Sequence, residues 1–285
     1  MKNFALPLFM TLGLLLNLLL PNAVSHASEF PPVLMYHDIK TVPVNGFDVS
    51  TKNFAAQLDL LQSEGYTVLG LDDLAECLAS GDSLSPAKSV VITFDDGYRG
   101  VYMNALPELR KRNMKAVLFI ITEMVGRLDT GYPHITHQEL REMASDDLLS
   151  FGSHSLTHPN FLQLSREERL SQLTQSRKDL ESLTGRRIHA FAYPYGSYDV
   201  NIASDVRESG YDFAFAIDSK DIPEVPEQFR IPRIYMRNSL TLEQLSDFLE
   251  NMPPEAFVEE YVDLAVSYDV VIAGGGMGGA GAALQ

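Results

Sequence analysis

Cysteine and basic side chains are scarce in this sequence. Its 285 residues include one cysteine, Cys77, which excludes an intramolecular disulfide. Cys77 falls within the amphipathic helical pattern Leu71–Leu78, where we expect a small core residue. The 22 lysines and arginines face 38 acidic residues, for a formal net charge of −16. This charge argues against nucleic acid or anionic membrane surfaces as partners.

The N-terminus has the pattern of an export signal. Lys2 precedes the apolar run Phe4–Leu20, and Ser25-His26-Ala27 places small residues where a signal peptidase reads them. We expect a signal peptide over residues 1–27 and a mature protein outside the cytoplasm, periplasmic or extracellular. The alternative is an uncleaved anchor, because the run is nearly long enough to span a bilayer.

Short apolar runs alternate with amphipathic helical patterns through residues 28–250. The apolar runs are Val33–Tyr36, Val68–Leu71, Val90–Phe94, Ala116–Ile121, Leu149–Phe151, Ala190–Tyr193, Phe213–Ile217 and Ile231–Tyr235. The helical patterns are Thr51–Glu64, Tyr102–Arg112, His137–Ala144, Arg166–Thr184, Ile202–Ser209 and Leu242–Glu250. This alternation predicts an α/β domain with a parallel sheet, open or closed into a barrel. Chemistry then belongs at the carboxyl ends of the strands.

One such end carries two adjacent carboxylates. Asp95 and Asp96 follow the apolar run Ser89–Phe94 and precede Gly97. Two ionised carboxylates that lie close repel each other, and a bound cation is the usual compensation. The alternative is a solvated Asp-Gly turn without any ligand.

Two histidines favour the cation. His154 and His158 follow the apolar run Leu149–Phe151, and a spacing of four places them on one face of a helical turn. Two imidazoles and one carboxylate form a three-ligand site with open positions, suited to Zn²⁺ or a similar divalent ion. Adjacent residues at a strand end point in different directions. One aspartate can therefore bind the metal while the other acts as a base.

A third strand end contributes a turn. Phe191–Gly196 contains Pro194 and Gly196, which fix a tight turn whose backbone N–H groups can face the site. A backbone donor beside a hydrolytic metal is what a tetrahedral oxyanion requires. An ordinary aromatic turn at the barrel rim is the alternative.

Together, Thr93–Tyr98, the pair His154 and His158, and Phe191–Gly196 resemble the polysaccharide deacetylase family, also known as the NodB-homology domain or carbohydrate esterase family four. The resemblance spans Pro32 to Phe248. It implies an irregular (β/α) barrel of about seven repeats. The opening Pro32–Asp38 is similar to the exported branch that deacetylates poly-N-acetylglucosamine.

The resemblance also implies roles for individual residues. Asp95 would be the catalytic base, and Asp96, His154 and His158 would hold the metal, Zn²⁺ or alternatively Co²⁺, Ni²⁺ or Fe²⁺. The backbone N–H of Tyr195 would stabilise the oxyanion. The implied partner is an N-acetylated polysaccharide (chitin-like, poly-N-acetylglucosamine or the peptidoglycan glycan). We expect a monomer that binds no nucleic acid and has no stable membrane span after signal cleavage.

Two family features are missing from the sequence. Many members carry an arginine in the third motif that orients the catalytic aspartate, where this sequence has Ala192. Many also carry a late histidine that protonates the leaving amine, and here no histidine follows His189. His37, at the first strand end, is our candidate for the proton donor. His134 and His137 are weaker candidates, for which a surface or capping role fits better.

Four tyrosines are candidates for contact with a sugar ring. Tyr36, Tyr98, Tyr193 and Tyr195 either line a sugar-binding groove or pack the barrel mouth. Two rival functions use the same residues: an esterase that removes O-acetyl groups from a glycan, and a noncatalytic glycan-binding protein. Acetate release from different acetylated glycans distinguishes all three.

Residues 251–285 fit the barrel poorly. The run Tyr268–Ala273 and the glycines Gly274, Gly276 and Gly279 resemble the opening of a dinucleotide-binding unit. The sequence has no room after Gly279 for a second strand, so we expect a C-terminal helix and a glycine-rich tail without dinucleotide binding.

Overall fold

The computed structural model describes residues 31–80, 88–217, 222 and 224–251. The expected signal peptide lies outside these residues. So do residues 252–285, which include the expected glycine-rich tail and all but the first residue of the segment expected to hold a C-terminal helix. Within the described ranges, no helix is long and apolar enough to cross a membrane.

Eight parallel strands form the main sheet. They are β1 (Val33–Tyr36), β4 (Thr67–Leu69), β5 (Ser89–Phe94), β6 (Ala116–Ile120), β7 (Leu149–Ser153), β8 (Ala190–Ala192), β9 (Phe213–Phe215) and β10 (Ile234–Tyr235). The short strands β2 (Asp38–Lys40) and β3 (Asp48–Ser50) pair with each other beside it. Each strand of the main sheet corresponds to an apolar run of the sequence, so the prediction of a parallel α/β sheet is confirmed.

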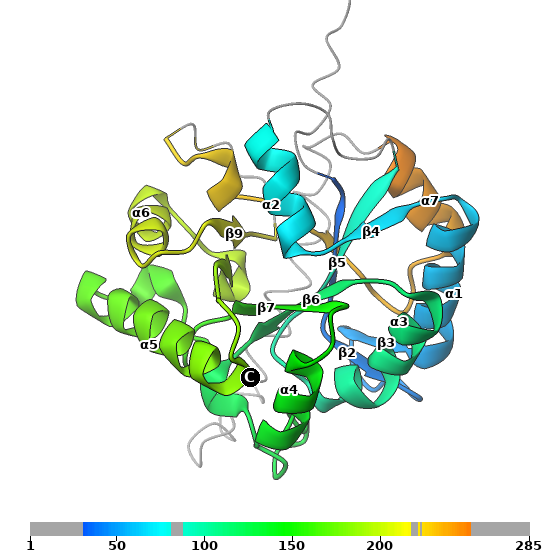
Figure 1. Cartoon of the computed structure of the whole chain (residues 1–285), viewed down its shortest axis with the longest axis horizontal. Helices are drawn as coiled ribbons and strands as arrows, with labels where there is room; N and C mark the ends of the chain where they lie inside the picture. The colour runs from blue at the N-terminus through cyan, green and yellow to red at the C-terminus, as the bar shows by residue number, and fades with distance from the viewer. Residues whose placement is uncertain (1–30, 81–87, 218–221, 223, 252–285) are drawn as a thin grey trace, which may run out of the picture.

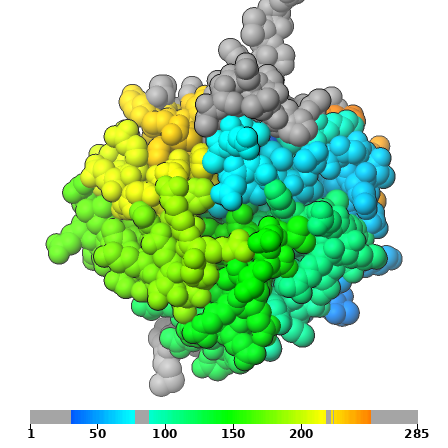
Figure 2. Space-filling model, viewed as in Figure 1, coloured from blue at the N-terminus to red at the C-terminus, as the bar shows by residue number. Residues whose placement is uncertain are grey.

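Helices surround this sheet (Figure 1). They are α1 (Thr51–Ser63), α2 (Leu71–Ser80), α3 (Leu106–Arg112), α4 (His137–Ala144), α5 (Arg166–Thr184), α6 (Val200–Glu208) and α7 (Leu242–Asn251). A π-helical turn, η1 (Val101–Ala105), precedes α3, and single 3₁₀ turns occupy η2 (Thr122–Met124), η3 (Phe161–Gln163), η4 (Pro194–Gly196) and η5 (Glu227–Phe229). Atoms of α2, α4 and α5 are all exposed on the face that Figure 2 shows.

Seven of the strands curl into a barrel in the order β10-β1-β5-β6-β7-β8-β9, and β4 adds to β5 outside this ring. The ring closes near Ile231, which bridges Phe215 of β9 immediately before β10 pairs with β1. Closure therefore rests on one bridge and a two-residue strand. The expected irregular (β/α) barrel of about seven repeats is confirmed.

Strand alternation divides the side chains between two cores. Leu34, Ile92 and Leu118 pack outward against the helices. Val91 and Phe119 belong to the second, smaller cluster, which also contains side chains of β8 and β9. Counting by twos along β5, the inward positions run from Val91 through Thr93 to Asp95. A buried carboxylate is therefore brought to the carboxyl end of the barrel interior.

Helix ends follow their sequence signals. Ser165 caps α5 with a complete capping box to Glu168, and Gly185 ends the helix in the left-handed conformation with φ of 68°. Thr136 and Glu139 form a second capping box at α4. These caps fix where α4 and α5 begin, on either side of the strand β7 that leads into the histidine motif.

Gly152 of β7 leaves space for the aromatic core of the barrel. A Cβ atom at this position would lie 2.4 Å from the ring of Phe119 and 2.9 Å from the Ala190 carbonyl oxygen. Phe119 in turn packs against Phe215, with ring centroids 5.1 Å apart, and supports the Arg233 guanidinium at 5.5 Å. The absence of a side chain at Gly152 is thus required for this packing.

We predict that Gly152→Ala lowers the free energy of unfolding by about 1–3 kcal/mol, because the added methyl group overpacks the core. Urea denaturation measures the change. Gly131→Ala is the matched control, since nothing lies within 4 Å of its Cβ position, and it should stay within about 0.5 kcal/mol of the parent. Equal effects of the two substitutions would contradict this account of Gly152.

Candidate active site

A cavity of about 60 Å³ opens at the carboxyl ends of the strands. All three sequence motifs contribute to it, together with the first strand end and the chain around β10. Its lining residues are Met35, His37, Phe47, Asp95, Asp96, Tyr98, His154, His158, Tyr193, Tyr195, Ile217, Arg233 and Tyr235. The position agrees with the expectation that chemistry lies at this end of a parallel barrel.

Asp96, His154 and His158 meet inside this cavity, and their ligand atoms all lie within 4.8 Å of one another. The two Nε2 atoms are 3.1 Å apart. Oδ1 of Asp96 is 3.5 Å from Nε2 of His154 and 3.8 Å from Nε2 of His158. A tetrahedral Zn²⁺ with bonds of about 2.0–2.1 Å separates its ligand atoms by roughly 3.3 Å. The three separations therefore suit a small divalent ion.

The protonation of His154 also suits a metal ligand. Its Nδ1 lies 2.8 Å from the Ala192 carbonyl oxygen, which only accepts hydrogen bonds. Nδ1 therefore carries the ring proton, and Nε2 presents its lone pair to Asp96 and His158. Burial lowers the pKa of His154 to about 3, so the imidazole is neutral at neutral pH.

The expected helical turn between the histidines is wrong. Residues 154–160 form a loop without helix, in which Ser155 (φ 68°) and His158 (φ 61°) are left-handed. The Ser155 hydroxyl accepts a hydrogen bond from the His158 N–H at 2.8 Å. Gln172 of α5 accepts two more from the backbone of Leu156 and Thr157. Hydrogen bonds to the loop, rather than helical periodicity, bring the two imidazoles together.

Asp95 is held by Arg233. Both guanidinium Nη atoms contact the carboxylate, one oxygen each, at 2.7 Å. Asp95 is 2% exposed and Arg233 1%, so the pair is almost completely desolvated. Burial alone raises the pKa of Asp95, but the Arg233 charge and hydrogen bonds outweigh it and lower the pKa to about 2. Asp95 is therefore ionised throughout the ordinary pH range.

Sequence reasoning missed Arg233. Ala192 stands where an arginine of the third motif was sought, and only its carbonyl oxygen serves the site, by holding His154. The guanidinium instead comes from the chain immediately before β10, where its Nε also donates to the Ala216 carbonyl at 3.1 Å. The sequence does contain a signal for this arginine. Arg233 interrupts an apolar run and lies two residues after Ile231, so in an extended chain the two side chains point to the same, inward side. Such a buried arginine requires a carboxylate partner.

Backbone strain is concentrated at this site. Among the described residues, five non-glycine residues have positive φ, and four of them are Asp96, Ser155, His158 and Tyr195. Left-handed conformations cost about 1–3 kcal/mol each in a residue with a side chain and cluster where function requires them. Asp96 at φ 69° turns its carboxylate away from the direction taken by Asp95.

The three candidate proton donors differ in position. His37 lines the cavity, and its ring lies between Phe47 at 5.7 Å and Tyr235 at 5.5 Å. His134 is buried against Tyr98, 4.9 Å between ring centroids, and does not line the cavity. His137 is an exposed first residue of α4. Only His37 therefore has access to a group in the cavity.

The tyrosines are also separated. Tyr98, Tyr193 and Tyr195 line the cavity, whereas Tyr36 is buried and donates to Gln57 Oε1 at 2.9 Å, away from it. Burial raises the pKa of Tyr98, and so does Asp96, which is hydrogen-bonded to its side chain. The Tyr195 ring packs on His158 at 4.5 Å. The Tyr193 hydroxyl donates a hydrogen bond to the Phe229 carbonyl oxygen at 2.9 Å.

Comparisons with known proteins agree with this geometry. Residues 83–214 match the polysaccharide deacetylase family model. YxkH of Bacillus subtilis is 27% identical over 221 residues, 78% of this chain and 76% of that protein. The poly-β-1,6-N-acetyl-D-glucosamine N-deacetylase of Staphylococcus epidermidis is 26% identical over 208 residues, 68% of this chain and 70% of that protein.

A solved structure supports the same assignment. The crystal structure of a polysaccharide deacetylase from Bacillus cereus superposes with a TM-score of 0.67 at 26% identity, covering 77% of this chain and 68% of that one. The family match includes Asp95, Asp96, His154 and His158 and ends within β9. With its barrel and its clustered motifs, this part of the chain is a polysaccharide deacetylase domain.

Proposed function

We propose that this protein is an exported, metal-dependent hydrolase that removes N-acetyl groups from a polysaccharide of the poly-β-1,6-N-acetylglucosamine type. The observation that carries the proposal is the division of labour between adjacent carboxylates. Asp96 converges with His154 and His158, whereas both carboxylate oxygens of Asp95, 3.9 Å from His154 at the nearest, are hydrogen-bonded by Arg233. The staphylococcal relative supports the choice of substrate through the polymer in its name.

Residues 1–27 and 28–250 are proposed as the signal peptide and the catalytic domain of this protein. The apolar run Phe4–Leu20 and the small residues before position 28 support export. A site for an insoluble or surface-attached polymer has access to its substrate only outside the cytoplasm.

Asp96, His154 and His158 would hold a divalent ion, which would supply the Lewis acidity that lowers the pKa of water and polarises an amide oxygen. Asp95 takes the proton of the attacking water. A carboxylate with a pKa of about 2 is a weak base, so it depends on that acidification. Its permanent ionisation ensures that the base is ready at any working pH.

The remaining roles belong to the cavity wall. Tyr195 has a left-handed backbone and its ring packs on His158, and we assign its N–H as the donor to the oxyanion that develops on the acetyl oxygen. His37 gives a proton to the departing sugar amine, which completes release of acetate. Tyr98 orients Asp96, and Tyr193 and Tyr195 border the bound acetamide.

Substitution of each aspartate separates base from ligand. We predict that Asp95→Asn lowers kcat for acetate release by about 10²–10⁴-fold while the bound metal stays stoichiometric. Asp96→Asn should lower metal occupancy and, with it, acetate release. Chelator treatment of the parent should lower acetate release in the same way. Elemental analysis and an acetate assay measure both quantities, with Asp72→Asn on the exposed face of α2 as control. Normal acetate release by Asp95→Asn would refute the base assignment.

Arg233 is proposed as a positioning residue. In Arg233→Met the buried Asp95 loses the charge that lowers its pKa, so the pKa rises and the carboxylate is ionised only at higher pH. We predict that kcat falls at least tenfold and that the acidic limb of the pH–rate profile moves to higher pH. Arg233→Lys should restore part of both. An unshifted limb with lowered kcat would mean that Arg233 only supports the fold.

His37 is tested by changing the leaving group. An amine must be protonated to leave, whereas the phenolate of 4-nitrophenyl acetate leaves without a proton. We predict that His37→Gln lowers kcat on an N-acetylglucosamine oligomer by about 10²–10⁴-fold and on the ester by much less. His137→Gln is the matched control. Equal losses on both substrates would exclude His37 as the proton donor.

A further inference from the structure

The two histidines of the three-ligand cluster are anchored to different layers of the molecule. His154 belongs to the barrel, because its N–H donates to the Ile120 carbonyl of β6 at 2.9 Å and its ring to the Ala192 carbonyl of β8 at 2.8 Å. His158 lies in the loop that follows, where its N–H donates to Oγ of Ser155 at 2.8 Å. The distance of 3.1 Å between their Nε2 atoms therefore depends on what holds this loop in place.

Gln172 of the helix α5 bonds to the loop between the histidines. Its Oε1 accepts from the N–H groups of Leu156 and Thr157 at 3.1 and 3.0 Å. Its Nε2 donates to the Thr157 hydroxyl at 2.9 Å. One side chain of the helix thus makes three hydrogen bonds to two consecutive loop residues. The second of them directly precedes His158, so Gln172 fixes the backbone from which that imidazole extends.

Buried serines form a second connection between α5 and the loop. The Ser176 hydroxyl donates to the Leu173 carbonyl at 3.2 Å, which uses its only proton, so Ser153 is the donor in the 2.7 Å contact between the hydroxyls of Ser153 and Ser176. The Ser153 oxygen then accepts from the Ser155 N–H at 3.1 Å. Because Ser155 also holds the N–H of His158, a continuous series of hydrogen bonds runs from α5 to the second histidine.

The residues Ser153, Ser155 and Ser176 are all 0% exposed. A buried hydroxyl costs free energy unless it is hydrogen-bonded, and an apolar side chain in the same place would stabilise the interface more. The helix α5 nevertheless buries Ser176 together with Leu173 and Leu180. A fully hydrogen-bonded polar network inside a core selects one arrangement of the chain. Here the arrangement selected is that of the histidine loop.

We propose that Gln172 and Ser176 are positioning residues of the metal site, which hold the histidine loop so that His158 reaches the ion together with His154 and Asp96. The inference rests on the proposed function, because it requires that these three side chains bind a divalent ion. Without the contacts to α5, the loop samples positions in which only two ligands converge. Groups that orient metal ligands without touching the ion typically contribute about 10–100-fold to metal affinity.

The affinity of the purified protein for Zn²⁺ tests the proposal. Metal is removed with a chelator, and Zn²⁺ is titrated back against a competing indicator. Gln172→Met keeps a side chain of similar length that scarcely accepts hydrogen bonds, and we predict that its Kd for Zn²⁺ rises about tenfold or more. Gln172→Glu retains the acceptor and should restore most of the affinity. Ser176→Ala removes the second connection and should also raise the Kd.

Cobalt provides a second measurement on the same proteins. The visible absorption bands of bound Co²⁺ depend on the number and arrangement of its ligands. We therefore predict that Gln172→Met and Ser176→Ala change the intensity or wavelength of these bands. A residue that only supports the fold would lower the resistance to urea but leave the Co²⁺ bands of the folded protein unchanged.

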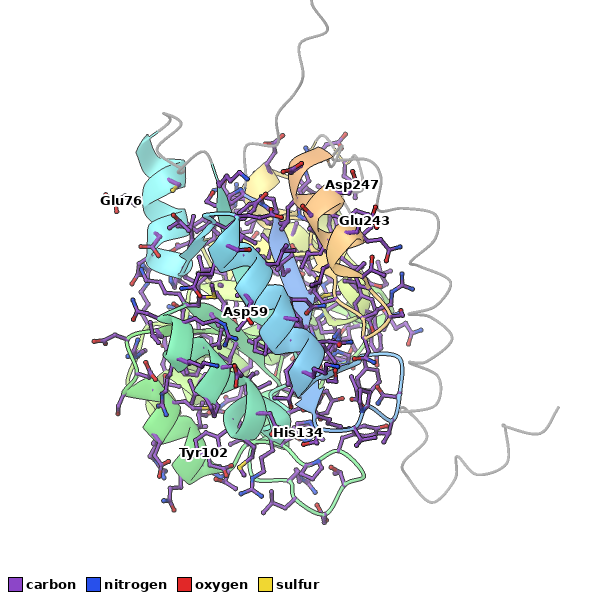
Figure 3. The ribbon with its side chains drawn as sticks, turned by 90° about the vertical axis from the view of Figure 1, so that its right-hand side faces the viewer. Asp59, Glu76, Tyr102, His134, Glu243 and Asp247 are labelled. Atoms are coloured by element: carbon purple, nitrogen blue, oxygen red, sulfur yellow. The ribbon has the colours of Figure 1, made fainter. Side chains whose placement is uncertain are left out.

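Two variants serve as matched controls. Gln175→Met changes the same residue type on the exposed face of α5, where Gln175 donates to Asp179 of the same helix at 2.7 Å. Tyr102→Phe removes a hydrogen bond of 2.6 Å to Glu142, which joins η1 to α4. The helix α5 lies on the left in Figure 1, whereas Figure 3 views the molecule from the right, where Tyr102 is labelled. Both controls should bind Zn²⁺ with the parental Kd.

The results separate the positioning role from the metal site itself. A parental Kd with parental Co²⁺ bands, in either folded variant, overturns the role of the residue that was changed and leaves the metal site intact. Each of the two variants decides for its own connection, so failure of one to fold does not protect the proposal. A parent protein that binds neither Zn²⁺ nor Co²⁺ refutes the metal site of the proposed function, and the positioning role with it.

Discussion

The ion pair between Asp95 and Arg233 is the interaction on which the site depends. A carboxylate buried in the barrel interior without a cation would become protonated and could not act as a base. Two hydrogen bonds of 2.7 Å keep it ionised and fix its orientation. The arginine comes from the chain that closes the barrel between β9 and β10. The segment that closes the barrel therefore also carries the arginine that keeps Asp95, the proposed base, ionised.

The same pair explains how adjacent aspartates take different tasks. Arg233 engages both oxygens of Asp95, which leaves the three-ligand cluster to Asp96. The left-handed backbone at Asp96 separates the two carboxylate directions within one peptide unit. Similar left-handed residues set the position of His158 and Tyr195. Strain of this kind is retained because the surrounding barrel strands and loop hydrogen bonds leave no other conformation available.

Sequence patterns predicted the sheet well because each buried strand is an apolar run bounded by turns, as in Ser89–Phe94. They placed Asp95 and Asp96 at a strand end for the same reason. The reasoning failed where conformation depends on distant partners. The loop of His154 and His158 is held by Gln172 of the following helix α5, a contact that local periodicity does not show, and we expected a helical turn instead. Arg233 was missed because its partner is 138 residues away, although its parity within an apolar run pointed inward.

Cavity size then connects the barrel to specificity. A seven-stranded ring encloses little space, and the side chains of Met35, Ile217 and Tyr193 are among those that line what remains at its carboxyl end. A space of about 60 Å³ has room for a few water molecules, so under the proposed function the acetyl group enters it and the sugar ring stays outside. Under the proposed function, the polymer is therefore recognised by residues outside this cavity. Substitutions there can alter the choice of polymer without disturbing Asp95 and Arg233.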